Sequence, residues 1–397
     1  MIAQDKRNLL TKSLSDDSMI LIVGNKEVVR NGDVMYPFRQ DSDFLLFTGL
    51  HIPDLILVGQ KREWEMQWTL YSDSITPHEN LWWTSRLSHR ELAVLSGISD
   101  IREKKWFKKD IMDKIQSISS LYVWTDRISR EEKALFQKLR LSKIQEKLVP
   151  LNPILDELRI IKTPEEIENI RQAIRVTCEA YNKIRANIKP KMYEYEIEAI
   201  VAGVYRSHHL TEAYPTIVAS GSSACTLHYA HHTRQIEEND LVLVDFWAEY
   251  HGYAADITRV FSISGMSVRQ KVVYEGVISV KKYAESLIRP GVKKSDYELQ
   301  VRTKMNEELE KLGLIPLGLN WEEKLILSRK YYPHSTSHFL GLDVHDVGER
   351  DAILRAGMVI TCEPGIYIPE EGIGIRLEDD ILVTESGCEN LSRDIPL

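Results

Sequence analysis

Two acidic residues lie on apolar segments within LVLVDFWAEYHGYAADITRVF, residues 241–261. Asp245 belongs to the first strand-like run and Asp256 to the second. A symmetric hairpin centred between Tyr250 and His251 would place these two aspartates directly opposite each other. Carboxylates opposed in this way have Cβ atoms about 4.5–5.5 Å apart, and their like charges repel.

The alternative to a chemical role is a solvated strand face, on which two acids need no explanation. Val244, Phe246 and Ile257 flank the aspartates and favour burial instead. Buried carboxylates require a shared proton or a cation. The segment therefore predicts a cation site.

A similar pattern returns near the end of the chain. GMVITCEPGIYI ends an apolar strand in Glu363, and GIGIRLEDDILVTE carries Glu378 near its middle. Two similar halves would form a pseudo-symmetric sheet whose acids converge on one point. Gly372-Ile373-Gly374 implies a bulge or a close approach of backbones. We expect Asp379 and Asp380 to be solvated or ladder-end acids.

Histidines cluster in HSTSHFLGLDVHD, residues 334–346, which contains His334, His338 and His345. Four carboxylates and one neutral imidazole would carry a charge of about −4, which two divalent cations balance. Oxygen-rich ligation with a single nitrogen favours Mn²⁺, with Zn²⁺ or Co²⁺ as alternatives. Two such ions would activate water for hydrolysis.

Composition narrows the class of protein. The chain has 397 residues, with 43% hydrophobic and 28% charged, and 51 basic against 59 acidic residues give a net charge of −8. This charge argues against nucleic acid as the main partner. Four scattered cysteines form no CxxC pair, which predicts a reducing, cytoplasmic location. No secretory signal and no apolar run of membrane-spanning length is expected.

Helices and strands alternate in a way that predicts two domains, residues 1–155 and 156–397. The first alternates strand-like runs at 19–24 and 55–59 with helical stretches such as 129–147, as in a small α/β domain. In the second, Thr163, Pro164 and Glu166 signal a helix start with a capping box. Further helices are expected near 191–208, 267–289 and 294–312, and strands near 241–261 and 358–384.

Five motifs in order carry a family resemblance: FRQDSDFLLFTGL, VDFWAEYHGYAADITR, SHFLGLDVHDVG, VITCEPGIYI and GIRLEDD. With them the chain resembles aminopeptidase P, in the superfamily of methionine aminopeptidase, prolidase and creatinase. The resemblance covers nearly the whole chain. It implies an α/β N-terminal creatinase-type domain and an α+β pita-bread catalytic domain with pseudo-two-fold symmetry. The implied activity is release of the first residue from peptides with proline second.

The resemblance also implies roles for individual residues. Asp245 would bind one metal, His338 and Glu363 the other, and Asp256 and Glu378 would bridge them. Glu363 would shuttle a proton, and His345 would contact the substrate carbonyl and the developing oxyanion. Other implied site residues are His228 in LHYA, His334, Arg376 near the proline pocket, and Asp43 and Trp82 from the N-terminal domain. A homodimer or homotetramer is implied, in which a neighbouring subunit can supply the last two.

Some motifs depart from the family pattern, and other functions are alternative interpretations of the sequence. HSTSH and VDFWAEY carry unusual residues, which puts the shape of the substrate pocket in doubt but removes no ligand. Prolidase, an Xaa-Pro dipeptidase, would share the ligand set, although PHENLWWTSR favours aminopeptidase P. Methionine aminopeptidase lacks the roughly 150 preceding residues, and creatinase binds no metal. A non-catalytic peptide-binding protein of the same fold is the remote alternative.

Overall fold

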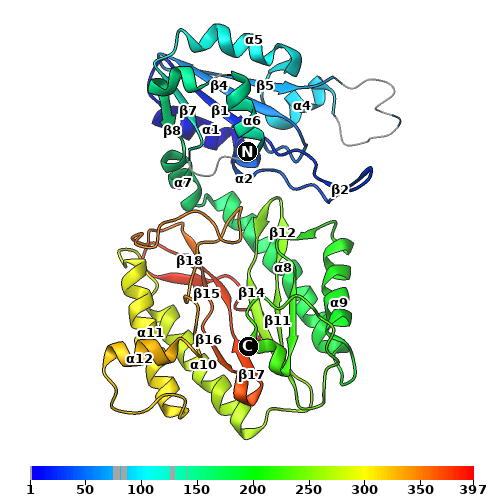
Figure 1. Ribbon diagram of the computed structural model, residues 1–397, viewed down its shortest axis with the longest axis vertical. Helices are drawn as coiled ribbons and strands as arrows, with labels where there is room; N and C mark the ends of the chain where they lie inside the picture. Colours follow the sequence, from blue (N-terminus) through cyan, green and yellow to red (C-terminus); the bar gives the residue numbers. More distant parts are fainter. Residues whose placement is uncertain (1, 75–80, 82–86, 126–129, 140) are drawn as a thin grey trace. The chain divides into compact units, whose positions relative to one another are not determined.

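The protein is described by a computed structural model that covers residues 2–74, 81, 87–125, 130–139 and 141–397 (Figure 1). The chain divides into two compact units, Met1–Leu158 and Arg159–Leu397. The expected boundary after residue 155 falls within helix α7 (Asn152–Ile160), where the division also lies. Among the described helices, none is both long and apolar enough to cross a membrane.

The first unit is built on a six-stranded mixed sheet with the strand order β6-β5-β4-β1-β7-β8. The run SMILIV forms β1, which is buried along its length between β4 and β7. The predicted strands near 19–24 and 55–59 are thereby confirmed as β1 and β4. The strands are β1 (Ser18–Val23), β2 (Val29–Asn31), β3 (Val34–Met35), β4 (Ile56–Arg62), β5 (Glu65–Ser72), β6 (Asp100–Glu103), β7 (Ser120–Val123) and β8 (Leu148–Pro150).

Helices of the first unit cover this sheet with apolar side chains. From α5, Phe107 and Ile111 pack in one buried cluster with Leu21 and Val58 of the central strands. The helix expected over 129–147 is interrupted, because a 3-10 segment with non-helical backbone at Ile144 (φ −128°, ψ 31°) follows α6. The helices are α1 (Ile2–Ser13), α2 (Ser42–Thr48), α4 (His89–Ser96), α5 (Lys104–Ile115), α6 (Arg130–Leu139) and the 3-10 segment η1 (Leu141–Lys147).

Long helices frame the second unit, and the first of them starts as the sequence predicts. The main-chain N–H of Glu166 donates to Thr163 Oγ1 at 3.3 Å, and Thr163 N–H donates to the Glu166 carboxylate at 2.7 Å. This capping box satisfies two main-chain donors of the first turn. The helices are α8 (Pro164–Asn187), α9 (Glu194–Ser207), α10 (Val268–Leu287), α11 (Lys294–Lys311) and α12 (Trp321–Ser328).

Short strands carry the remaining part of the second unit in small sheets. Three sheets have the orders β10-β11-β14, β13-β12-β9 and β15-β18-β19, and β16 pairs with β17. The strands are β9 (Thr211–Glu212), β10 (Ile217–Ser220), β11 (Leu241–Phe246), β12 (Ala248–Tyr250), β13 (Tyr253–Ala254), β14 (Ile257–Ser262), β15 (Val359–Cys362), β16 (Gly365–Ile368), β17 (Ile373–Arg376), β18 (Asp379–Val383) and β19 (Cys388–Asn390), with the 3-10 turns η2 (Gly221–Cys225) and η3 (Pro369–Glu371).

The second unit consists of two similar halves, as expected. Each half contains a helix pair, α8 with α9 or α10 with α11, followed by acid-bearing strands (Figure 1). In each half the connector between the helices forms three main-chain hydrogen bonds with the segment leading to the first acid-bearing strand. The bonded pairs are Lys191–Ile236, Met192–Ile236 and Glu194–Arg234 in the first half, and Gly291–Leu354, Val292–Leu354 and Lys294–Ala352 in the second. This repeated pattern supports the pseudo-two-fold relation.

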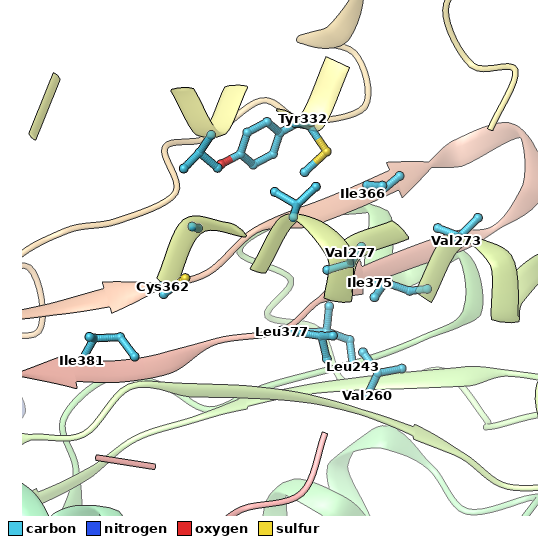
Figure 2. Close-up of a cluster of buried hydrophobic side chains, with 14 of the residues drawn as sticks. Leu243, Val260, Val273, Val277, Tyr332, Cys362, Ile366, Ile375, Leu377 and Ile381 are labelled. Carbon is cyan, nitrogen blue, oxygen red and sulfur yellow. The ribbon is translucent and has the colours of Figure 1, made fainter. Parts of the chain in front are cut away.

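A buried apolar cluster lies between helix α10 and the strands of both halves. Figure 2 shows Val273 and Val277 of α10 beside Ile375 of β17, with Leu243 of β11 and Val260 of β14 farther from the helix. Residues from both halves share this one cluster. Burying such side chains is worth about 1.5–3 kcal/mol each. The cluster therefore holds the two sets of acid-bearing strands together.

The predicted register of the first hairpin is wrong. Asp245 pairs with Thr258 rather than facing Asp256. The turn residues are His251 and Gly252, with φ of 50° and 84°, so the hairpin centre lies one residue later than expected. A two-residue turn with both φ values positive matches the twist of the strands, and Gly252 adopts this geometry without strain. Asp256 consequently lies in the break between β13 and β14.

Candidate metal centre

The predicted ligands occur where strands end or are interrupted. Asp245 lies on β11, and Asp256 directly precedes β14. Glu363 follows β15, and Glu378 lies in the break between β17 and β18. His338 precedes a residue that forms an isolated bridge to β15. Breaks in the ladders leave these polar side chains free to converge instead of alternating between the two faces of a sheet.

Three of these residues form a compact cluster. Asp256, His338 and Glu378 each offer one ligand atom, and the three atoms lie within 4.8 Å of one another. The Nε2 atom of His338 lies 3.0 Å from Oδ2 of Asp256 and 3.7 Å from Oε1 of Glu363. The structure thus brings three of the four predicted carboxylate ligands close to the imidazole nitrogen of His338, itself a predicted ligand.

The ring of His338 is oriented by its second nitrogen. Nδ1 lies 3.0 Å from the main-chain oxygen of Phe339, so the proton on Nδ1 can be donated there. The main-chain N–H of His338 donates to Thr361 Oγ1 at 3.1 Å. These contacts leave Nε2 facing the carboxylates, and such support of a histidine by its other nitrogen is usual for metal ligands.

Three carboxylate oxygens of the predicted ligands lack hydrogen-bond partners among the described residues. These are both oxygens of Asp256 and Oδ1 of Asp245, and both side chains are buried. Burial, reinforced by neighbouring acids, raises the pKa of Asp256 and of Glu378 well above the ordinary range. Burial raises the pKa of Glu363 to about 7. Orphaned buried carboxylates beside one imidazole fit a divalent cation.

Asp245, the fifth predicted ligand, is held by Arg376. The guanidinium Nη2 lies 2.5 Å from Oδ2 of Asp245, and Nε donates to Thr258 Oγ1 at 3.0 Å. The Thr258 hydroxyl in turn donates to Oε2 of Glu378 at 2.6 Å. Arg376 is only 5% exposed, so in this structure it orients two of the acids. A contact between Arg376 and substrate stays a prediction.

Burial and neighbouring charges affect two of the other predicted histidines. The His334 Nε2 atom lies 2.9 Å from the Tyr367 hydroxyl, and burial lowers the pKa of His334 to about 3. The His345 ring packs edge-on against His338 with centroids 4.4 Å apart, and burial lowers its pKa to about 4. His228 contacts Tyr214, with ring centroids 6.0 Å apart. Electrostatic repulsion by His228 is among the smaller causes that lower both of these pKa values.

The expectation that Asp379 and Asp380 are solvated is wrong, although Asp379 does lie at the end of the β15–β18 ladder. They are 2% and 0% exposed. Asp379 binds Arg259 Nη2 at 2.6 Å and also pairs with Lys281. Asp380 accepts the main-chain N–H of Asp256 at 3.1 Å. Apolar strand neighbours bury both acids, and the two cations and the N–H replace the water they lose.

Arg259 connects this buried network to the ligands. Its Nη1 atom donates to the main-chain oxygens of Thr258 at 3.0 Å and of Glu378 at 2.5 Å. Its other nitrogens donate to the main-chain oxygens of Ile395 and Pro396 at 2.8–3.2 Å. One side chain therefore ties β14 to the segment between β17 and β18, and with it the main chains beside two predicted ligands.

Two predicted site residues belong to the first unit. Asp43 lies in the first turn of α2. Trp82 lies outside the described residues. Their roles at the entrance to the site stay predictions. Sequence reasoning in turn missed Thr258, Tyr367 and Arg259; only Thr258 carried a signal, because it lies two positions after Asp256 on an alternating strand.

Comparison with known proteins agrees with this geometry. A model of metallopeptidase family M24 matches residues 168–385, which include the whole cluster. The chain belongs to metallopeptidase family M24. A second model, the N-terminal domain of aminopeptidase P, matches residues 3–123. This M24 protein therefore combines a catalytic domain of the family with a creatinase-type N-terminal domain, as the sequence predicted.

Relatives of this M24 protein match over nearly their full length. The Xaa-Pro aminopeptidase of Escherichia coli is 33% identical over 99% of this chain and 94% of its own, and that of Haemophilus influenzae is 32% identical over the same shares. Aminopeptidase P from E. coli, in a solved structure, superposes with a TM-score of 0.91 at 31% identity, covering 100% of this chain and 95% of that one. One E. coli structure is zinc-substituted and holds a product.

Proposed function

We propose that this protein is a two-metal aminopeptidase that releases the N-terminal residue from peptides with proline at the second position. Membership of the M24 family and full-length relatives named Xaa-Pro aminopeptidase support the substrate class. The observation that carries the proposal is the buried Asp256 carboxylate, which has no hydrogen-bond partner among the described residues and lies beside His338, Glu363 and Glu378.

The metal ligands in this proposal are Asp245 on one ion, His338 and Glu363 on the other, and Asp256 and Glu378 shared between them. Two divalent ions would balance the four carboxylates, and the oxygen-rich set favours Mn²⁺, with Zn²⁺ and Co²⁺ as alternatives. When bound, such ions would supply a nucleophilic water and polarise the scissile carbonyl.

Glu363 is the proposed proton carrier. In the metal-free protein its pKa is about 7, because burial disfavours the charged form. A carboxylate beside the attacking water can act as its general base. Glu363 lies 3.6 Å from Nδ1 of His334 and 3.7 Å from Nε2 of His338. In the proposed reaction it takes a proton from the attacking water and passes one to the leaving proline nitrogen.

His345 and His228 are the proposed donors to the substrate carbonyl. A pKa of about 4 keeps His345 neutral at pH 7, so it can donate an N–H without bringing a full charge into the site. A donor aimed at the oxygen that becomes negative stabilises the transition state more than the ground state. His334, held by the Tyr367 hydroxyl at 2.9 Å, would line the substrate side together with Arg376.

Replacing Glu363 tests the proton carrier. Glu363→Gln should lower kcat by about 10²–10⁴-fold, because an amide cannot transfer the proton. Glu371→Gln is the matched control: this acid pairs with Arg269 at 2.7 Å on the exposed surface and should keep full activity. A Glu363→Gln protein with two bound metals and near-native kcat would rule out the assigned role.

His345→Ala separates transition-state contact from binding. The variant should lower kcat more than it raises KM, because the contact strengthens as the oxyanion develops. An effect on KM alone would reassign His345 to substrate binding.

Substrate length decides between the proposal and an Xaa-Pro dipeptidase. Purified protein with Mn²⁺ should cleave Xaa-Pro-Yaa peptides with a higher kcat/KM than Xaa-Pro dipeptides. The reverse preference would favour the dipeptidase, and no cleavage of either would favour a peptide-binding role.

Assembly as a homodimer or homotetramer and a cytoplasmic location belong to the same proposal. The four cysteines are all free thiols, which supports a reducing compartment. The mass in solution tests the oligomer, and a monomer would exclude a neighbour's contribution to the site.

A further inference from the structure

The imidazole of His345 is oriented by few contacts of its own. It stands in residues 339–347, the His345 loop, which has no regular secondary structure between its bridge to β15 and its end. In the described part of the chain, no hydrogen bond to the ring is found, and its only ring contact is with His338 at 4.4 Å. The position of His345 therefore depends on what fixes the main chain of this loop.

Asp346, the next residue, fixes that main chain from two sides. Its N–H donates to the main-chain oxygen of Phe339 at 2.9 Å, which closes the loop across seven residues. Its carboxylate lies against Gly341: a Cβ at Gly341 would be 2.1 Å from Asp346 Oδ2. The side chain of Asp346 is 1% exposed. The carboxylate thus occupies the interior of the loop and leaves no room for a side chain at position 341.

Two buried cations hold this carboxylate. Arg159 Nη2 pairs with Oδ1 of Asp346, and Lys162 Nζ donates to Oδ2 at 3.0 Å. Burial alone would raise the pKa of Asp346, but Lys162 and Arg159 lower it below the ordinary range. Burial also lowers the pKa of Lys162, because desolvation disfavours its charged form. Desolvation disfavours the charge on Asp346 as well, but attraction to the two cations outweighs it there. Removing one partner of such a buried pair is far more costly than removing a surface pair.

The cations are themselves tied to the strand that leads to Glu363. The main-chain N–H of Lys162 donates to the main-chain oxygen of Gly357 at 2.9 Å, two residues before β15. Arg159 also binds Asp343 of the loop at 2.7 Å. The Asp346 carboxylate therefore links the His345 loop to the same framework that carries the proposed proton carrier.

We propose that Asp346 is a positioning residue that, through Arg159 and Lys162, sets the place of His345 relative to the metal cluster. The inference rests on the proposed function, because His345 acts there as the donor to the substrate carbonyl. In this proposal Asp346 acts only through its contacts with Arg159, Lys162 and the loop's main chain. A displacement of about 1 Å in a catalytic group can cost about 10²-fold in rate.

The test is a double-mutant cycle with Asp346→Asn, which keeps the shape and removes the charge. In the wild-type background we expect kcat to fall by about 10–100-fold with little change in KM and unchanged bound metal. In the His345→Ala background, Asp346→Asn should change kcat by no more than about twofold, because the group it positions is already missing. Equal falls in both backgrounds would overturn the proposal.

Matched variants separate positioning from general destabilisation. Asp240→Asn removes another carboxylate paired with an arginine, Arg234, and should leave kcat unchanged. A fall in kcat with Asp240→Asn as large as that with Asp346→Asn would count against a specific role. Lys162→Met removes one of the two cations and should show the same coupling to His345→Ala. This variant replaces Asp346→Asn in the double-mutant cycle if Asp346→Asn does not fold.

Amide hydrogen exchange tests the inference without an activity measurement. Residues 339–347 should exchange faster in Asp346→Asn than in the wild type, while β11 and β14 stay unchanged. Unchanged exchange in the loop would overturn the positioning role. If the wild type cleaves no Xaa-Pro peptide, the proposed function fails, and the exchange comparison still decides what Asp346 does to the loop.

Discussion

Replacing Arg259 by Met removes the connection between the two sets of acid-bearing strands while keeping an unbranched stem that resembles the arginine's methylene chain. Arg259 is 1% exposed and makes six hydrogen bonds, five to main-chain oxygens and one to Asp379. Asp379 keeps Lys281 as a partner, but the carbonyl groups lose theirs. Breaking one partner of a buried pair costs about 3–5 kcal/mol, a large share of the roughly 5–15 kcal/mol that stabilises a folded domain.

Metal binding should weaken with the same substitution. Thr258 and Glu378 lose the donor that holds their main-chain oxygens, and loss of such supporting contacts typically costs about 10–100-fold in metal affinity. Urea unfolding of metal-depleted protein measures the stability, since bound ions would otherwise add to it. Competition with a chelator measures the affinity.

Arg393→Met is the control for this prediction. Its side chain is 68% exposed and lies 3.6 Å from Glu389, so the same substitution there should change stability by less than about 0.5 kcal/mol. The reasoning is refuted if Arg259→Met lowers the free energy of unfolding by less than about 1 kcal/mol and leaves metal affinity unchanged. Arg259 would then contribute little to holding the two sets of strands together.

Three further substitutions follow from close contacts and charge. Gly374→Ala should lose about 1–3 kcal/mol, because its Cβ would be 2.2 Å from a main-chain oxygen of η2, whereas Gly203→Ala, with open space in α9, should gain about 0.5–1 kcal/mol; thermal unfolding compares them. Thr258→Val should lower metal affinity by about tenfold or more, because Glu378 loses its hydroxyl donor at 2.6 Å, and Thr258→Ser should retain it in chelator competition. The wild type should be more stable to unfolding than Asp346→Asn, with the largest difference above about pH 4, the pKa of aspartate in the unfolded chain. The difference should disappear as the pH falls through the lower pKa of Asp346 in the folded protein, because the carboxylate is then protonated. A difference that does not shrink at all as the pH falls below about 4 would show that charge is not its origin.

Local signals in the sequence were sufficient to predict several helix and strand positions and the burial of the acids. The capping box of Thr163 and Glu166 set the start of α8, and apolar runs around the acids predicted burial correctly. The glycines of GIGIR implied a close approach, which Gly374 makes to η2. Each of these features depends on neighbours within a few residues, so the sequence alone contains the information.

Features that depend on long-range partners could not be predicted. The sequence alone favours a solvated Asp379, because its partners Arg259 and Lys281 lie 120 and 98 positions away. The hairpin register depended on a turn whose centre differed by one residue, which moved Thr258 opposite Asp245. Arg159 and Lys162, which hold Asp346, lie 187 and 184 positions before it in the sequence. No pattern near Asp346 indicates that these two residues are its partners.

The central claim is that buried carboxylates around His338 bind the metals that make the protein a peptidase. The most direct measurement combines elemental analysis with cleavage of an Xaa-Pro-Yaa tripeptide during stepwise metal removal and return. We predict that chelation abolishes cleavage, that Mn²⁺ restores it, and that activity reaches its maximum with about two ions bound per chain. Full cleavage by protein shown to contain no metal would contradict the account.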